Sequence, residues 1–384
     1  MYIELYVNPS VGSDSNIGTM SNPYKTISKA ADVIREICQS ASDDAEYTFC
    51  VMLSDAVHII DSTVNINGIG QKIIFKPYDD MYATITGLIR VNNSILKAEG
   101  NNLFSFELKD SNGCPIFTKD IYLNSKKLEQ YPNVSDFSDL SENSFFADYG
   151  CGKYTLRTKD GEDMRYCALH CSVTPILFNL CGCKNIFFEN IDFYACSVTE
   201  SGGIASVFYL DGCSNIEFNR CRFNKINSYA VYARNSSRGL NIHDCEFTDA
   251  PLSVISIADR CGDLQTPENG AKIINNRISD CESGICIKSD NLFEISHNTF
   301  EYIRKCVFNF DGSAQIALMF NRIEKSKFDF SVLSGIRLLP DSYGGLNYIA
   351  VSDADAFAGV FSDSEEVKSK AGYRKKIRNY GDVL

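Results

Sequence analysis

The sequence predicts an all-β fold, a parallel β-helix or solenoid with an N-terminal capping helix. The main observation is a repeat between Pro175 and Lys325, and a second is strand periodicity inside each repeat. Apolar residues alternate two positions apart, as they do along one face of a strand. Six segments align without a gap in four columns: "NIFFENIDF", "NIEFNRCRF", "LNIHDCEF", "AKIINNRI", "FEISHNTF" and "IALMFNRI".

Each repeat of about 22–24 residues supplies at least two short strands separated by polar turns. A meander of hairpins would also do so, but like residues recurring at one position favour parallel stacking, in which each lies above its equivalent. The third column ends in Asn276, Asn298 and Asn321. We interpret it as an inward ladder at a corner, because stacked amides can bond the backbone or one another. Asn residues in ordinary turns are the alternative.

The remaining chain is divided by its patterning. Residues 1–49 predict a strand, a loop and a helix that Thr26 caps, with Ile27, Ala30 and Ile34 on its apolar face. That helix would cover the open first rung. Residues 50–174 predict irregular early rungs with insertions, 175–340 the regular rungs, and 341–384 a C-terminal cap or tail.

Composition restricts the partners. The chain has 384 residues with 37 basic and 49 acidic side chains, a formal charge of −12, which excludes a general nucleic-acid binder. No apolar run reaches the roughly 18 residues of a membrane span. No secretory signal is seen at the start, so we expect a cytoplasmic protein whose 16 cysteines are free thiols. A truncated sequence would instead allow an extracellular protein with disulfides.

Two stretches resemble a known group. "YVNPSVGSDSNIGTMSNPYKTISKA" resembles the opening of bacterial right-handed parallel β-helix proteins of the pectate-lyase-like superfamily. "IYLNSKKLEQYPN" resembles their motif in which "VNGKR" precedes an Arg-Tyr-Pro-Asn run. The nearest grouping is glycoside hydrolase family 141 with its uncharacterised relatives, and the similarity covers roughly residues 3–340. It implies an oligo- or polysaccharide substrate.

The chain also departs from that pattern. Gln130 replaces the Arg before Tyr-Pro-Asn, and only Asp329 remains of an acidic run that the relatives carry. Asp259 and Arg260 partly match a family loop. The resemblance therefore implies substrate contact for Asp259 and Arg260 and a catalytic role for Asp329. The further rungs that usually follow are missing, which indicates a shortened and, on one interpretation, inactive relative.

Glycoside hydrolysis needs two carboxyl groups, about 5–5.5 Å apart for retention and about 6.5–9.5 Å apart for inversion. Equivalent residues on adjacent rungs lie about 4.8 Å apart. Asp249 and Asp280 occupy one column in successive repeats, with Lys225 beside them. We therefore predict that they form a catalytic acid and nucleophile pair in which one pKa is raised. The alternative is that both Asp side chains cap turns.

The other candidates are weaker. His297 lies near the third column and is a candidate substrate contact, although a hydrogen-bonded turn residue is the simpler interpretation. The cysteine spacing predicts no metal site. No cofactor is expected unless the protein is a Ca²⁺-dependent polysaccharide lyase. A non-catalytic carbohydrate-binding or structural module is the remaining alternative, in which 20 Tyr could replace the absent Trp for sugar stacking. Neither the sugar nor the oligomeric state follows from the sequence.

Overall fold

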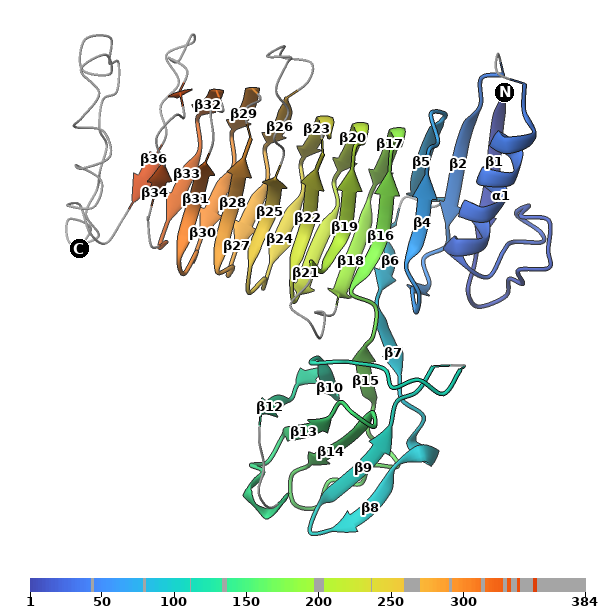
Figure 1. Ribbon diagram of the computed structural model, residues 1–384, viewed down its shortest axis with the longest axis vertical. Coiled ribbons are helices and arrows are strands. Elements are labelled where there is room, and N and C mark those ends of the chain that lie inside the picture. The colour runs from blue at the N-terminus through green and yellow to red at the C-terminus, as the bar shows by residue number, and fades with distance from the viewer. Residues whose placement is uncertain are drawn as a thin grey trace.

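The computed structural model is a long stack of β rungs with one domain projecting from its flank (Figure 1). Each rung contributes one strand to each of three parallel sheets, here named sheets I, II and III. Along the chain a rung runs from sheet III to sheet I and then to sheet II. The structure describes residues 1–42, 45–78, 81–110, 112–132, 137–196, 204–235, 237–258, 270–289, 292–311, 315–326, 330–332, 337–338 and 348–350.

Sheet I contains β1 (Tyr2–Val7), β2 (Thr48–Leu53), β5 (Lys72–Pro77), β17 (Lys184–Glu189), β20 (Ser214–Asn219), β23 (Arg238–His243), β26 (Ala271–Ile274), β29 (Leu292–Ser296), β32 (Gln315–Met319) and β35 (Arg337–Leu338). Sheet II contains β3 (Val57–Ile59), β6 (Ala83–Thr86), β18 (Ile191–Cys196), β21 (Arg222–Ile226), β24 (Glu246–Thr248), β27 (Arg277–Ser279), β30 (Thr299–Glu301), β33 (Arg322–Glu324) and β36 (Tyr348–Ala350). Sheet III contains β4 (Val64–Asn67), β16 (Ile176–Cys181), β19 (Ser206–Asp211), β22 (Tyr229–Arg234), β25 (Ser253–Ala258), β28 (Ser283–Lys288), β31 (Cys306–Asp311) and β34 (Phe330–Val332).

The predicted in-register stacking is confirmed. Phe223 pairs with Phe247, and Phe247 with Ile278, on three successive strands of sheet II. The rings of Phe223 and Phe247 are stacked, with centroids 4.7 Å apart and planes 7° apart. All three side chains are buried. The repeated columns therefore form the interior of the stack.

The asparagine ladder is also confirmed, at the corner between sheets I and II. Asn276, Asn298 and Asn321 are buried, and the amide oxygens of Asn298 and Asn321 each accept from the Asn one rung earlier. The Asn276 oxygen accepts from the backbone N–H of Cys245. Their Nδ2 atoms also donate to strand carbonyls. Side chains thus replace the backbone partners that a tight corner lacks.

The predicted capping helix is α1 (Ile27–Ser40), which lies over the N-terminal end of the stack (Figure 1). The Thr26 hydroxyl accepts from the backbone N–H of Lys29 at 3.1 Å, as an N-cap does. Ile27, Ala30 and Ile34 are buried in the core of the rungs. Within the described part of the chain, no helix has both the length and the apolar character that crossing a membrane requires.

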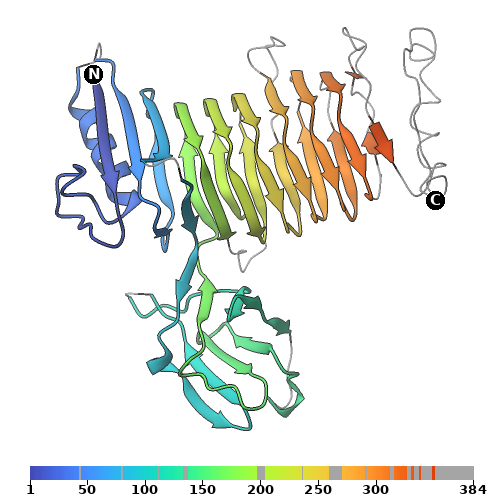
Figure 2. The ribbon, with the colours of Figure 1, turned by 180° about the vertical axis from the view of Figure 1, so that it is seen from behind.

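Residues 50–174 differ from the expectation of irregular rungs. The rungs stop at the end of β6 and resume at β16, and the chain between them folds into a separate inserted domain (Figure 2). Its strands pair with one another, mostly antiparallel, and enclose a second hydrophobic core. One sheet contains β7 (Leu88–Arg90), β15 (Leu169–Ser172), β10 (Ile121–Leu123) and β11 (Lys126–Lys127). The other contains β8 (Lys97–Gly100), β9 (Leu103–Glu107), β14 (Lys153–Arg157), β13 (Ser144–Asp148) and β12 (Glu129–Tyr131), and two short 3₁₀ turns span Asn93–Ile95 and Phe137–Asp139.

The C-terminal boundary also differs from the prediction of 340. Strand β36 pairs in register with β33, so the rung pattern continues to Ala350. Residues 351–384, most of the predicted cap or tail, lie outside the described residues.

Candidate functional site

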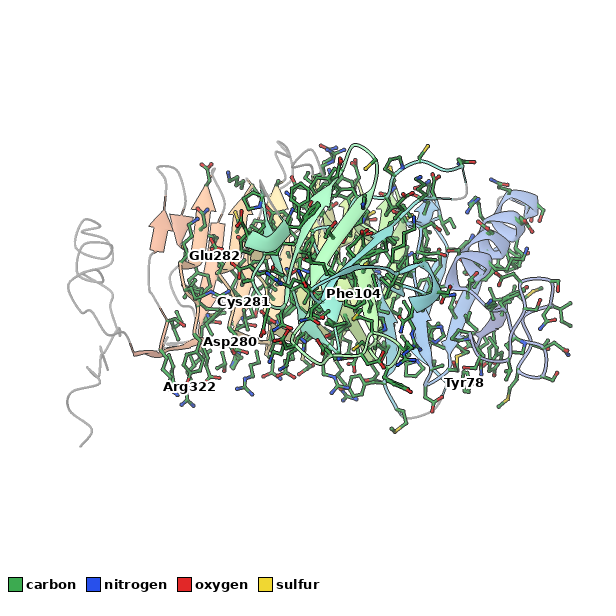
Figure 3. The ribbon with its side chains drawn as sticks, turned by 90° about the horizontal axis from the view of Figure 1, so that it is seen from below. Tyr78, Phe104, Asp280, Cys281, Glu282 and Arg322 are labelled. Atoms are coloured by element: carbon green, nitrogen blue, oxygen red, sulfur yellow. The ribbon has the colours of Figure 1, made fainter. Side chains whose placement is uncertain are left out.

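The structure places Asp249 and Asp280 on adjacent rungs. They follow β24 and β27, whose last residues, Thr248 and Ser279, pair in register. Both lie at the corner between sheets II and III, where Figure 3 shows Asp280 with its neighbour Cys281. Burial raises the pKa of the Cys281 thiol to about 12, and both carboxylates add to that shift, which places both near the thiol.

The backbone gives these two Asp residues a turn role as well. Asp249 has φ 55° and Asp280 φ 57°, and Lys225 has φ 53° at the equivalent position. Asp adopts this left-handed conformation at less cost than most residues. Both carboxylates are exposed to solvent, whereas Lys225 is half-buried with its Nζ 5.4 Å from the Tyr194 ring centroid. The corner therefore brings the predicted pair together without enclosing it.

The other predicted residues do not join this pair. His297 is exposed at the different corner between sheets I and II, where its ring stacks on Phe320 at 4.9 Å. Asp259, Arg260 and Asp329 lie outside the described residues.

An aromatic surface on the outer face of sheet III was missed by the sequence reasoning. Tyr209 and Tyr232 pair in register on β19 and β22, and their rings stack with centroids 5.7 Å apart and planes 14° apart. The ring of Tyr229 lies 5.3 Å from that of Tyr232. All three are half-buried. We call Tyr209, Tyr229 and Tyr232 the tyrosine platform.

A fixed polar group borders the tyrosine platform. Arg234 ends β22 and donates from Nη2 and Nε to Asp211 Oδ2, at 2.8 and 3.1 Å. Asn235 donates to the other carboxylate oxygen at 2.9 Å. The guanidinium also lies 5.0 Å from the Tyr209 ring centroid. An oriented carboxylate and guanidinium therefore lie beside half-buried aromatic rings.

The signal that could have identified the platform is strand alternation, because Tyr209 lies between Phe208 and Leu210, which both face the core. The outward position one rung later is Tyr232, and the next is Ser256. The stacked pair is thus confined to two rungs.

The inserted domain is fixed against the corner near Asp249. Lys127 Nζ lies 2.6 Å from the carboxylate of buried Asp120 and 2.9 Å from the amide oxygen of Asn227, which begins the sheet II–III corner of its rung. Asn227 in turn donates to the Tyr122 hydroxyl at 3.2 Å. Burial raises the Tyr122 pKa, and the charge of Asp249 contributes. The inserted domain therefore stands beside one member of the predicted carboxylate pair.

Among the described residues, no group of three or more His, Cys, Asp or Glu side chains is placed to hold a metal ion.

Comparison with known proteins supports the fold. The family model for a right-handed β-helix region matches residues 206–342. No curated protein sequence matches the chain. The chain has the right-handed parallel β-helix fold of pectate-lyase-like proteins.

Solved structures with this fold are only distantly similar in sequence. One described as a glycoside hydrolase is 12% identical with a TM-score of 0.52, and the match covers 87% of this chain and 96% of that chain. A rhamnogalacturonan lyase is 9% identical, with a TM-score of 0.41 and coverage of 91% and 90%. A family 136 lacto-N-biosidase from Eubacterium ramulus is 12% identical, with a TM-score of 0.43 and coverage of 83% and 56%.

Proposed function

We propose that this chain is a glycan-directed protein that binds a saccharide along the outer face of sheet III. The observation that carries the proposal is the stacked Tyr209–Tyr232 pair with the Arg234–Asp211 ion pair at its edge. Aromatic rings offer the flat apolar surface on which the C–H face of a sugar packs. The carboxylate accepts from sugar hydroxyls, and the guanidinium donates to them.

The direction of the sheet suits a linear chain of sugars. Successive rungs repeat about every 4.8 Å along the axis, so the outward-facing residues of sheet III form a straight row. Beyond the platform this row continues through Ser256, Cys286 and Asn309. Ser256 and Cys286 are buried and Asn309 is half-buried, so the accessible contact surface for a saccharide on this sheet is centred on the tyrosine platform.

The reaction that we propose is glycoside hydrolysis by Asp249 and Asp280. Their rung spacing of about 4.8 Å is near the roughly 5–5.5 Å of retaining enzymes. Substrate contact by Lys225, Asp259 and Arg260 and a catalytic role for Asp329 belong to the same proposal. The roles of Asp259, Arg260 and Asp329 rest on the family resemblance. His297 is left out of this site, because it lies at the corner between sheets I and II.

A non-catalytic glycan-binding module is the second candidate. It is favoured by the exposure of Asp249 and Asp280 and by their positive φ angles, which a turn role alone explains. A Ca²⁺-dependent lyase is distinguished by experiment, because its activity would disappear with EDTA.

The test combines binding with product analysis. The full chain is screened against neutral and acidic polysaccharides, with Ca²⁺ or EDTA, by calorimetry, by release of reducing ends and by ultraviolet absorbance of unsaturated products. We expect Tyr232→Ala to weaken saccharide binding about tenfold, since about 1.4 kcal/mol corresponds to that factor. The matched control is Tyr166→Ala, at a tyrosine that is 85% exposed on the inserted domain.

Hydrolysis is tested with Asp249→Asn and Asp280→Asn, which should abolish cleavage and preserve binding. Full activity in both variants would reject the pair. Binding without cleavage by the unmodified chain would support the module, and unchanged binding by Tyr232→Ala would reject the platform.

A further inference from the structure

A cavity of about 300 Å³ lies between the inserted domain and the first rungs. On one side it is lined by the outer face of sheet II, and on the other by the four-stranded sheet of the inserted domain. It is on a different sheet from the tyrosine platform. Its volume is at the lower end of the range for small-molecule sites, about 300–1,000 Å³.

The sheet II wall is largely apolar. Val57 and Ile59 on β3 are 53% and 49% exposed, although they are β-branched aliphatic residues. Ile59 pairs with Thr86, and Thr86 with Tyr194, so these three form one row toward the cavity. Leu88 extends the apolar lining where the chain enters the inserted domain.

The opposite wall carries a row of polar side chains. Arg90 pairs in register with His170, and His170 with Tyr122, across β7, β15 and β10. Directly paired residues point to the same face of a sheet, and all three line the cavity. Burial lowers the pKa of His170, and the Arg90 charge adds to this, so the imidazole is neutral at pH 7.

Arg90 is the uncompensated charge at this cavity. Its guanidinium is exposed, and no carboxylate of the described residues lies within ion-pair distance of it. The nearby carboxylates have other partners: Asp120 is bound by Lys127 and Asp192 by Arg222. In a chain with a formal charge of −12, one free guanidinium above an apolar floor selects for a single negative charge.

We propose that this cavity binds a small monocarboxylate with a flat or branched apolar body, and that Arg90 pairs with the carboxylate. The planar guanidinium matches a carboxylate with two parallel hydrogen bonds. A dianion such as phosphate would meet only one cation here. A sugar would lose water from hydroxyls that Val57, Ile59 and Leu88 cannot replace, whereas an apolar body gains from the same contact.

The test is calorimetry on the full chain with benzoate as the probe, compared with benzamide and glucuronate. We expect benzoate to bind at least tenfold more tightly than either, because benzamide lacks the charge and glucuronate lacks the apolar body. Arg90→Gln should weaken benzoate binding at least tenfold. The matched control is Arg165→Gln, which removes another exposed guanidinium of the inserted domain and should leave binding unchanged.

Two further variants separate this site from others. Ile59→Ser should weaken benzoate binding without altering charge, and Tyr232→Ala should leave it intact because the platform is on sheet III. Circular dichroism confirms that each variant is folded. Equal affinity for benzamide, tightest binding of glucuronate, or unaltered benzoate binding by Arg90→Gln would each overturn the proposal.

Discussion

Replacing Asn298 by alanine tests how the corner between sheets I and II is stabilised. The Asn298 side chain is fully buried. Its Nδ2 donates to the Ile273 carbonyl at 2.7 Å and to Asn321 Oδ1 at 3.0 Å. Its Oδ1 accepts from the backbone N–H and the side-chain amide of Asn276, both at 2.9 Å. Alanine removes all four hydrogen bonds from a site without exposure to water.

The loss in free energy of unfolding depends on which hydrogen-bonding partners of Asn298 are left without another partner. Asn321 Oδ1 still accepts from the Asn298 backbone, and Asn276 Nδ2 still donates to Ile242. The Asn276 N–H and the Ile273 carbonyl each lose their bond to the side chain. The Ile273 carbonyl lies within β26, which is paired with β29, so the group left without a partner is the Asn276 N–H. One buried polar group without a partner predicts a loss of about 1–3 kcal/mol.

The assay is equilibrium urea unfolding followed by circular dichroism. The matched control is Asn224→Ala, at an exposed position of sheet II, which should change the free energy of unfolding by less than about 0.5 kcal/mol. Asn298→Cys should fall between, since Cys245 in the same column accepts from the Cys221 N–H and donates to the Phe218 carbonyl. The reasoning is refuted if Asn298→Ala is no more destabilising than Asn224→Ala.

Three further predictions concern other parts of the chain. Burial raises the pKa of Asp120 above its ordinary 3.8, so the folded state holds this proton more tightly than the unfolded state. Stability should fall as the pH rises through the interval above 3.8, and Asp120→Asn should remove that fall from the pH dependence of the urea midpoint. Exposed Cys114, Cys151 and Cys181 should react rapidly with a thiol reagent in the folded protein, whereas buried cysteines such as Cys171 and Cys196 should react only in denaturant; serine at the three exposed positions should remove three thiols from the fast phase, and an unchanged fast phase would count against this. Thr26→Ala should cost about 1 kcal/mol in urea unfolding, and Thr26→Ser should restore most of it.

The repeating part of the fold could be predicted because equivalent positions in successive rungs have the same surroundings and therefore carry similar residues. Phe223, Phe247 and Ile278 share one interior position, so their similarity in sequence is a direct sign of stacking. The asparagine ladder follows the same logic, since only a side chain with both a donor and an acceptor continues such a row. These signals are local and periodic, and a single sequence displays them.

The inserted domain could not be predicted because it has no repeat. Its strands are short, and their apolar alternation is equally compatible with an irregular rung. Whether Phe104 pairs with Leu156 in a separate core or with a neighbouring rung depends on contacts far apart in sequence. No local pattern distinguishes these outcomes.

The candidate site was predictable only in part for a related reason. Column counting correctly placed Asp249 beside Asp280, but it gives no measure of enclosure. It also overlooked Tyr209 and Tyr232, because the search followed carboxylates and not the outward positions of sheet III. The cavity at Arg90 requires two units of the fold to meet, which the sequence does not show.

The way in which the inserted domain joins the rungs gives the scaffold a modular character. Leu88 and Ser172, at its two ends, pair with each other across β7 and β15, while β6 and β16 remain bound to their own neighbours above and below. The entering and leaving strands thus pair with each other and hold the two ends of the inserted domain together. The entropic cost of closing the loop therefore depends only weakly on how many residues the inserted domain contains. A different domain whose two ends lie close together would therefore fit at the same position and leave the pairing of the rungs unchanged.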